Sequence, residues 1–465
     1  MIGGAKLMKN ILPVHRGKQI ELTINGLGSS GEGVGRYQDF TIFARGALPK
    51  EVVKVEIETV KKNYAQGKMV AILKGSKERK DAICPVYDKC GGCQLQHLDY
   101  GAQIKAKTLQ VKETLTRIGH LKDINVLPTL KAAEPFYYRN KMQFPVSARK
   151  GRVEIGCYAA ASHDVVDVEH CYIQKTINND IVAVVRKWMK EYKIAPYDED
   201  RGSGLVRHVM GRVGAKTGEV MVVLVTTTYD IPHIKELISD LRKTIPNLKS
   251  VIQNINKRHT NVILGTKERV LFGKAAINDK IGDLSFKISA QSFFQVNTEQ
   301  AEVLYNKAIE FASLTGKETV FDIYCGTGTI SLFLAKQAKA VYGIEIVPSA
   351  ILDARKNAEY NKRANVTFML GDAAQKLPEL LHMGVKPEVV VIDPPRAGCE
   401  ERVLKAIAGV KPKRIVYVSC NPSTLARDLA LLEKEGYKTS KVQPVDMFPQ
   451  TYHVETVVLM SRVDK

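Results

Sequence analysis

The alternation of hydrophobic and polar positions divides the chain into three segments of different character. In the first, from about Lys18 to Leu73, short runs alternate between apolar and polar residues, which is typical of β-strands. Strands are predicted at 19–25, 40–43, 51–60 and 68–73, with a glycine-rich turn region at 26–35. The pattern predicts a small antiparallel β-barrel of OB-like size at residues 12–75.

The middle segment, from about Leu127 to Leu284, mixes strand and helix periodicities. Strands are predicted at 151–159, 205–213 and 219–226, and helices near 176–192 and 231–243. An amphipathic helix at 101–119 precedes this segment and is predicted to pack on a core. The segment is therefore expected to form an α+β central domain.

From about Ser285 the chain alternates regularly between strands and helices. The predicted strands are 319–324, 340–344, 365–370, 389–392, 415–418, 441–447 and 454–462, and the predicted helices include 298–313, 330–336 and 423–435. This order predicts an α/β fold, a doubly wound Rossmann-like domain that closes with a β-hairpin.

Charge adds a prediction about partners. The 465 residues include 69 Lys and Arg against 49 Asp and Glu, a net charge of +20, which indicates a polyanionic partner, with nucleic acid preferred over an anionic membrane surface. Nine basic residues fall in or just after the later half of the predicted barrel, where they suit RNA backbone contacts. They are Lys50, Lys54, Lys61, Lys62, Lys68, Lys74, Lys77, Arg79 and Lys80.

Two further basic and aromatic stretches, 137–141 and 253–258, are also candidates for RNA contact.

Residues 1–12 lack the apolar core of a secretory signal, and no stretch approaches the length of a membrane span. Eight cysteines spread unevenly over so long a chain do not form a disulfide framework. We therefore expect a cytoplasmic, monomeric protein without a membrane partner.

A glycine turn and a following acidic residue predict a nucleoside cofactor. Gly326 and Gly328 follow a strand, and Glu345 ends the next strand about 20 residues later, where a carboxylate can bind ribose hydroxyls. Ile330 and Ser331 stand where a dinucleotide fingerprint has its third glycine, which favours S-adenosylmethionine over a pyrophosphate cofactor. Asp372 and Asp393 end two further strands and strengthen this prediction.

Cys420 is the candidate nucleophile. It lies in Ser419-Cys420-Asn421-Pro422, between a predicted strand and a predicted helix, where the carboxyl ends of strands face a cleft. The helix N-terminus is expected to favour its thiolate form. A buried, inert cysteine is the alternative interpretation.

The neighbouring motifs narrow the reaction. Asp393-Pro394-Pro395-Arg396 resembles the acidic-Pro-Pro motif with which nucleic-acid methyltransferases hold a base. Pyrimidine C5 becomes nucleophilic only after a thiolate adds at C6, so Cys420 points to C5 of uracil or cytosine. A base must then remove the C5 proton, and Glu455 is a candidate for it.

A cysteine cluster predicts an inorganic centre. Cys84, Cys90 and Cys93 have the spacing C-x5-C-x2-C, and Cys171 or Cys157 can supply a fourth thiolate. Four thiolates hold either a [4Fe-4S] cluster or zinc. Zinc sites usually pair two C-x2-C knuckles, and only one is present here, so the spacing favours an iron-sulfur cluster. Zinc and unmetallated cysteines remain open as alternatives.

Taken in order, these motifs resemble the RNA uracil-C5-methyltransferase family. The resemblance rests on Ser292 to Asn297, Asp322-x-Tyr324-Cys325-Gly326-x-Gly328, the motifs around Asp393 and Cys420, and His453-Val454-Glu455. It covers nearly the whole chain, and the N-terminal barrel resembles the family's TRAM domain. The resemblance implies a central domain at 76–94 and 126–284 and a catalytic domain at 95–125 and 285–465.

The resemblance also implies roles for individual residues. Cys420 would be the nucleophile, Glu455 the proton-abstracting base, and Asp393 a residue of both the catalytic and the cofactor site. The cofactor residues would be Gln295, Tyr324, Gly326, Gly328, Glu345, Asp372 and Asp393, and the [4Fe-4S] ligands Cys84, Cys90, Cys93 and Cys171.

The implied substrate is a uridine flipped out of large-subunit ribosomal RNA, because members with both TRAM domain and cluster resemble the ribosomal enzymes more than the tRNA uracil-54 type. Alternatives are tRNA uracil-C5 methylation, cytosine-C5 transfer and a non-catalytic iron-sulfur RNA-binding protein. A radical methylthiotransferase is disfavoured because its C-x3-C-x2-C triplet is absent.

Overall fold

The chain folds into two compact units. The computed structural model describes residues 12–149 and 151–463. The first unit comprises the described residues up to Ala82 together with Gln94–Ala106, and the second comprises Ile83–Cys93 and the described residues from Lys107 onward. No helix among the described residues is long and apolar enough to cross a bilayer.

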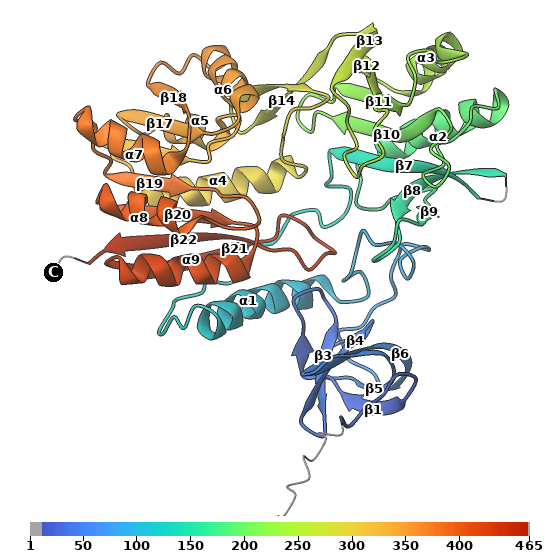
Figure 1. Ribbon diagram of the computed structural model, residues 1–465, viewed down its shortest axis with the longest axis horizontal. Coiled ribbons are helices and arrows are strands. Elements are labelled where there is room, and N and C mark those ends of the chain that lie inside the picture. Colours follow the sequence, from blue (N-terminus) through green and yellow to red (C-terminus); the bar gives the residue numbers. More distant parts are fainter. Residues whose placement is uncertain (1–11, 150, 464–465) are drawn as a thin grey trace, which may run out of the picture. The chain divides into compact units, whose positions relative to one another are not determined.

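The first unit contains a six-stranded sheet of order β1-β5-β6-β4-β3-β2 (Figure 1). Its strands are β1 (Gln19–Thr23), β2 (Gly26–Leu27), β3 (Gly33–Tyr37), β4 (Phe40–Arg45), β5 (Val52–Val60) and β6 (Tyr64–Lys74). The expected all-antiparallel order is wrong at one place, because β4 and β6 run parallel. The predicted turn at 26–35 contains β2 and β3. At Gly35 a Cβ atom would lie 2.3 Å from the carbonyl oxygen of Thr23, so close strand approach accounts for this glycine.

Arg79 is not free for RNA, contrary to the sequence interpretation. Its guanidinium lies 2.6 Å from the carboxylate of Glu51, which is fully buried, and also donates to the carbonyl oxygen of Gly46. The guanidinium therefore satisfies a buried charge within this unit. Eight of the nine basic residues remain exposed: Lys50, Lys54, Lys61, Lys62, Lys68, Lys74, Lys77 and Lys80.

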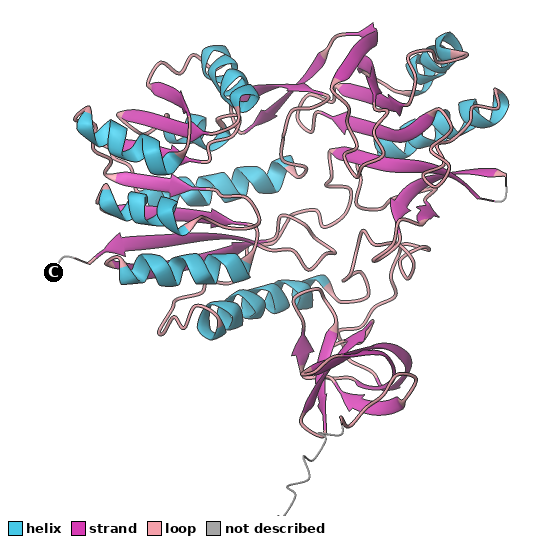
Figure 2. Cartoon of the chain, in the orientation of Figure 1, coloured by secondary structure: helices cyan, strands magenta, loops and turns pink. Residues whose placement is uncertain are grey.

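The C-terminal part of the second unit is built on a seven-stranded sheet of order β18-β17-β16-β19-β20-β22-β21 (Figures 1 and 2). Its strands are β16 (Thr319–Ile323), β17 (Ala340–Glu345), β18 (Val366–Leu370), β19 (Val389–Ile392), β20 (Arg414–Ser419), β21 (Tyr437–Val445) and β22 (Glu455–Arg462). The first five strands along the chain are parallel, and β22 is antiparallel to both of its neighbours. This confirms the predicted α/β fold with its closing hairpin.

Helices cover both faces of this sheet. One face packs on α4 (Thr298–Ala312), α5 (Thr329–Leu334) and α6 (Pro348–Tyr360). The other face packs on α7 (Ala373–His382), α8 (Glu401–Gly409) and α9 (Pro422–Lys434). Val111 and Leu115, from the second half of α1 (Tyr100–Arg117), join this second core. The strands read as continuous apolar runs because both faces are buried.

The middle part of the second unit contains another seven-stranded sheet, of order β13-β12-β11-β10-β7-β8-β9. Its strands are β7 (Lys141–Arg149), β8 (Arg152–Tyr158), β9 (Val165–Asp167), β10 (Val206–Val213), β11 (Val220–Thr226), β12 (Leu248–Ile255) and β13 (Lys267–Gly273). The helices α2 (Thr176–Glu191) and α3 (Ile234–Thr244) pack on one face. Met210 and Met221 of the opposite face share a core with α4 and with the hairpin β14 (Ala276–Ile281) and β15 (Leu284–Ser289).

The two candidate RNA-contact stretches in this region prove to be partly buried. Gln253 and Asn254 are fully buried in β12, where Asn254 exchanges two hydrogen bonds with the backbone of Gly265. Tyr138 is 4% exposed and donates its hydroxyl proton to the carbonyl oxygen of Pro449. The amide side chains give β12 a polar sequence, and for this reason the hydrophobic pattern did not reveal the strand.

A buried ion pair fixes the loop between β21 and β22. The ammonium of Lys107 lies 2.5 Å from a carboxylate oxygen of Asp446, and the two side chains are 1% and 0% exposed. Lys107 also donates to the carbonyl oxygen of Phe448. Asn297 and Gln300 of the α4 N-terminus donate to the carbonyl oxygens of Met447 and Asp446. Removal of one partner would leave a buried charge uncompensated, so this loop is tightly constrained.

Candidate active site

A cavity of about 670 Å³ lies at the carboxyl ends of β16, β17, β19 and β20. This edge is where open α/β sheets bind ligands. Side chains or backbone from all the motif segments line the cavity. Its lining includes Arg139, Phe293, Gln295, Tyr305, Asp322, Tyr324, Gly326, Glu345, Ile346, Asp393, Pro394, Pro395, Cys420, Phe448 and Glu455.

The glycine turn between β16 and α5 has the left-handed backbone that glycine favours. Gly326 has φ of 53° and Gly328 of 81°, and Tyr324, a non-glycine residue, also has a positive φ of 64°. A Cβ atom on Gly328 would lie 2.6 Å from the ring of Phe368, whereas one on Gly326 would meet no atom within 4 Å. Gly328 therefore serves packing, and Gly326 leaves open space in the cavity.

Glu345 is held rigidly at the end of β17. One carboxylate oxygen accepts the backbone N–H of Gly326 at 3.1 Å, and the other accepts that of Val347 at 2.9 Å. Each oxygen keeps a second lone pair for a ligand hydroxyl. Ile346 and Val347 are 62% and 46% exposed beside it, which suits the face of a flat ring. These residues fit the ribose and base of S-adenosylmethionine.

Two of the predicted cofactor residues do not line the cavity. Asp372 instead caps α7, accepting the backbone N–H of Ala374 at 2.8 Å, and pairs with Arg402 at 2.7 Å. Gly328 is the residue before α5 and packs against Phe368. Asp372 thus caps the helix that follows its strand, and Gly328 allows the close packing before the next helix. Sequence spacing alone cannot distinguish these roles from ligand binding.

Cys420 and Glu455 meet because β22 runs antiparallel to β20. Ser419, the last residue of β20, is paired with Thr456, so Cys420 and Glu455 fall at the same edge although 35 positions apart. Both line the cavity, together with Asp393 at the end of β19. The sulfur of Cys420 is thus not sealed in the interior.

The acidic groups of the cavity have raised pKa values. Burial raises the pKa of Asp393 to about 7, and burial together with Asp393 raises that of Glu455 to about 8. Burial also raises the pKa of Asp322 to about 7, although the hydroxyl of Ser331 donates to this carboxylate. Perturbed groups gathered in one cavity are typical of a functional site.

The pKa of Cys420 is shifted in the direction opposite to the sequence expectation. Burial, followed by the carboxylates of Glu455 and Asp393, raises it to about 11. One N–H at the N-terminus of α9, that of Ser423, is already used by the side chain of Asn421, which caps the helix. Near neutral pH this pKa favours the protonated thiol over the thiolate.

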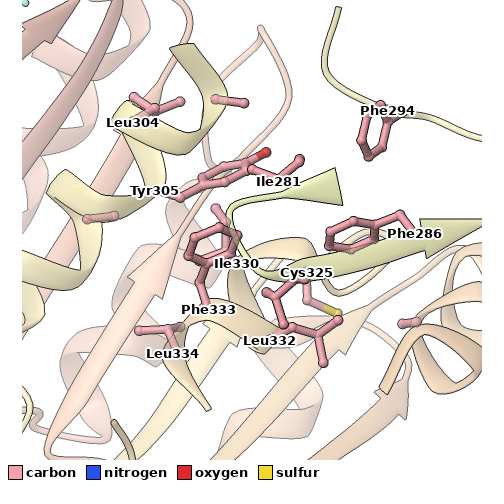
Figure 3. Close-up of a cluster of buried hydrophobic side chains, with 14 of the residues drawn as sticks. Ile281, Phe286, Phe294, Leu304, Tyr305, Cys325, Ile330, Leu332, Phe333 and Leu334 are labelled. Carbon is pink, nitrogen blue, oxygen red and sulfur yellow. The ribbon is translucent and has the colours of Figure 1, made fainter. Parts of the chain in front are cut away.

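An apolar cluster forms the wall behind the cavity (Figure 3). Tyr305 of α4 and Phe333 of α5 have ring centroids 5.4 Å apart, and Phe286 of β15 lies 5.7 Å from Phe294. Tyr305 and Phe294 also line the cavity. The rings thus join the hairpin β14–β15 and both helices into one rigid wall.

Five cysteines gather away from this cavity. Cys84, Cys90 and Cys93 come from one short segment, Cys157 from β8 and Cys171 from the turn before α2. A hydrogen bond with Cys157 lowers the pKa of Cys90 to about 7, and the charge of Cys90 contributes to the raised pKa of Cys171. Among the described residues, no group of three or more His, Cys, Asp or Glu side chains is arranged to hold a metal ion.

Some lining residues had no usable signal in the sequence. Arg139 belongs to a stretch that the sequence connects with RNA contact but not with this cavity. Tyr305 lies within a predicted helix, and its position there gives no indication that it lines a cavity. Phe448 lies in a loop without a motif. Each reaches the cavity through tertiary contacts between distant segments.

Comparison with known proteins assigns the fold to a family. Residues 217–463 match the family model described as tRNA (Uracil-5-)-methyltransferase, and residues 13–70 match the TRAM domain. An uncharacterized RNA methyltransferase of Clostridium acetobutylicum is 48% identical over 460 residues, covering 98% of this chain and all of the relative. One from Caldanaerobacter subterraneus is 52% identical, covering 96% and 99%.

A solved structure is similar over nearly the same length. The Pyrococcus abyssi tRNA (uracil-54, C5)-methyltransferase in complex with S-adenosyl-L-homocysteine has a TM-score of 0.76 and 28% sequence identity, covering 95% of this chain and all of that chain. The chain therefore belongs to the family of S-adenosylmethionine-dependent RNA uracil-5-methyltransferases.

Proposed function

We propose that this enzyme methylates C5 of a flipped-out uridine in large-subunit ribosomal RNA through a covalent bond between Cys420 and C6 of the base. The observation that carries the proposal is the meeting of Cys420, Glu455 and Asp393 in the cavity that also contains Glu345 and the glycine turn. A thiol, two carboxyl groups and a nucleoside-binding edge are the parts that this reaction requires.

The first step is the attack of the Cys420 sulfur on C6. The thiol gives its proton to the carboxylate of Asp393, which lies beside it in the cavity, so that Glu455 stays ionised for the later step. The new S–C6 bond moves the electrons of the C5–C6 double bond toward C5 and the O4 carbonyl, so that C5 becomes nucleophilic. Bound S-adenosylmethionine supplies the methyl group that C5 takes up.

Glu455 completes the reaction as a base. After methyl transfer C5 carries both the methyl group and its original proton. The carboxylate of Glu455 accepts this proton, the C5–C6 double bond re-forms and the S–C6 bond breaks. The raised pKa of Glu455, about 8, makes its carboxylate a stronger base than an exposed glutamate.

The substrate class has two candidates. The sequence resemblance favours large-subunit ribosomal RNA. Transfer RNA is the second candidate, because the similar solved protein is named a tRNA (uracil-54, C5)-methyltransferase and covers 95% of this chain. Because a tRNA enzyme covers nearly the whole chain, the domain architecture alone does not indicate a ribosomal RNA substrate. The non-catalytic alternative loses its basis, because the chain belongs to an enzyme family.

The five gathered cysteines support a [4Fe-4S] cluster held by Cys84, Cys90, Cys93 and Cys171. Gly92 lies beside two of the thiols, since a Cβ atom there would be 3.4 Å from the sulfur of Cys90 and 3.9 Å from that of Cys157. Cys157 is also close to Cys90, Cys93 and Cys171, so five thiols lie near one another, although the described side chains are not arranged as a metal site. Four thiolates are the ligand set of this cluster.

Substituting each of the two proposed catalytic residues should separate adduct formation from release of the product. Cys420→Ala should abolish methyl transfer and the adduct with 5-fluorouridine RNA, because no sulfur can add to C6. Glu455→Gln should form the adduct with unmodified RNA and release it slowly, whereas the surface variant Glu401→Gln should behave as the wild type. Denaturing gels with labelled RNA measure both. Rapid turnover by Glu455→Gln would remove Glu455 from the role of base.

The pKa of Glu455 predicts a pH-dependent stability difference. Its pKa is raised in the folded protein, so the folded state binds the proton more tightly than the unfolded state, and stability is lost as pH rises from about 4.5 to 8. The variant Glu455→Gln has no titrating group at this position, so it does not lose stability in this way. Its free energy of unfolding relative to the wild type should therefore rise by about 1 kcal/mol per pH unit over this window. A difference independent of pH in urea unfolding would contradict the shifted pKa.

Metal analysis should identify the centre and its fourth ligand. Anaerobically purified protein should contain about four iron and four sulfide per chain. Cys171→Ser should lose most of this iron, and Cys157→Ser should retain it. Retention in Cys171→Ser with loss in Cys157→Ser would exchange the two assignments, and zinc without iron would refute the cluster.

Nucleoside analysis should decide the RNA class. Ribosomal RNA and tRNA from a strain that lacks this protein are each incubated with the enzyme and S-adenosylmethionine. We expect 5-methyluridine to form in 23S-type RNA and not in tRNA. Formation in tRNA alone would establish the second candidate, and 5-methylcytidine would contradict the choice of base.

A further inference from the structure

The loop that follows Asp393 is tied to the helix that follows Cys420. Four side chains of the α9 region reach this loop. The amide of Asn421 donates to the carbonyl oxygen of Arg396 at 3.1 Å, and the hydroxyl of Thr424 donates to the same oxygen at 3.4 Å. Arg427 donates to the carbonyl oxygens of Ala397 and Cys399 at 3.1 and 3.2 Å.

Asp428 is the buried centre of this connection. Its side chain is fully buried, and one carboxylate oxygen accepts both the backbone N–H of Cys399 at 2.7 Å and the hydroxyl of Tyr417 at 2.5 Å. The other oxygen pairs with Arg427 at 2.7 Å. A single carboxylate thus binds the loop, strand β20 and α9, three elements that converge on the cavity.

The loop leaves no room for a side chain at Gly398. Gly398 has φ of 80°, and a Cβ atom there would lie 2.5 Å from the guanidinium of Arg427 and 2.7 Å from the carboxylate of Asp428. Glycine is therefore required both by the backbone conformation and by the close approach. The sulfur of Cys399 in turn lies 3.6 Å from the hydroxyl of Tyr324 in the glycine turn.

We propose that Asp428 is a positioning residue that holds the Pro394–Cys399 loop in register with Cys420. The inference rests on the proposed function, in which Pro394 and Pro395 stand beside the base that Cys420 attacks. Asp428 does not line the cavity. It acts through the backbone of Cys399 and through Tyr417, which lies three residues before Cys420 on β20. Small displacements of reacting groups are costly, because attack requires close and aligned atoms.

The test compares adduct formation with cofactor binding in Asp428→Asn. This variant preserves the side-chain shape but replaces one acceptor oxygen with an N–H₂ group. We expect the rate of adduct formation with 5-fluorouridine RNA to fall by about tenfold to a hundredfold. The affinity for S-adenosylhomocysteine should stay within about twofold, because Glu345 and Gly326 bond to each other and not to the Pro394–Cys399 loop. The matched control is Asp180→Asn, an exposed aspartate on α2.

A second variant keeps the test decisive if Asp428→Asn does not fold. Arg427→Gln changes a half-exposed residue that binds the carbonyl oxygens of Ala397 and Cys399 and pairs with Asp428, and it should slow adduct formation by at least about fivefold. Wild-type rates in folded Asp428→Asn, or in Arg427→Gln where the first does not fold, would overturn the inference. An equal loss of cofactor binding would likewise reduce Asp428 to a general structural role. Absence of adduct in the wild type would instead refute the proposed function, and this inference with it.

Discussion

The site depends on the burial of three carboxyl groups and a thiol in one cavity at the edge of a sheet. Asp322, Asp393 and Cys420 come from the ends of parallel strands, and Glu455 begins the antiparallel strand beside them. Burial opposes the charged form of each group, so all four pKa values rise. The three carboxyl groups, with pKa values of about 7 to 8, can thereby exchange protons near neutral pH, as acid and base catalysis requires.

Such a cavity requires rigid surroundings, and distant segments provide them. The loop between β21 and β22 is held by the buried Lys107–Asp446 pair and by Tyr138, Asn297 and Gln300. The loop after Asp393 is held by α9. In both cases polar side chains bind loop backbone, and at the buried bonds, such as that from Cys399 to Asp428, a missing partner is costly. Both loops beside the cavity are thus held in place by the protein itself.

Much of this fold follows from the sequence, because the apolar strands and the glycine turn carry strong local signals. The failures have physical causes. Strand β12 was missed since Gln253 and Asn254 fill a buried strand with amides that bond to the backbone. The parallel pair β4–β6 depends on a crossover that periodicity does not encode.

The chemistry was less predictable than the positions. Cys420 and Glu455 were found from motifs, and the strand register brings them together. The pKa of Cys420 was predicted in the wrong direction, because a helix terminus is visible in the sequence and two buried carboxyl neighbours are not. Asp372 had the expected position at a strand end, but its carboxylate caps a helix. Local spacing identifies candidates, and tertiary contacts decide their roles.

In the proposed mechanism a single sulfur activates the uracil ring. Tandem mass spectrometry tests this step on the complex trapped with 5-fluorouridine RNA and S-adenosylmethionine, after digestion with nuclease and protease. We expect one modified peptide, which carries the methylated fluorouridine nucleotide on Cys420. A nucleotide attached to another residue, or a nucleotide on Cys420 without the methyl group, would contradict it.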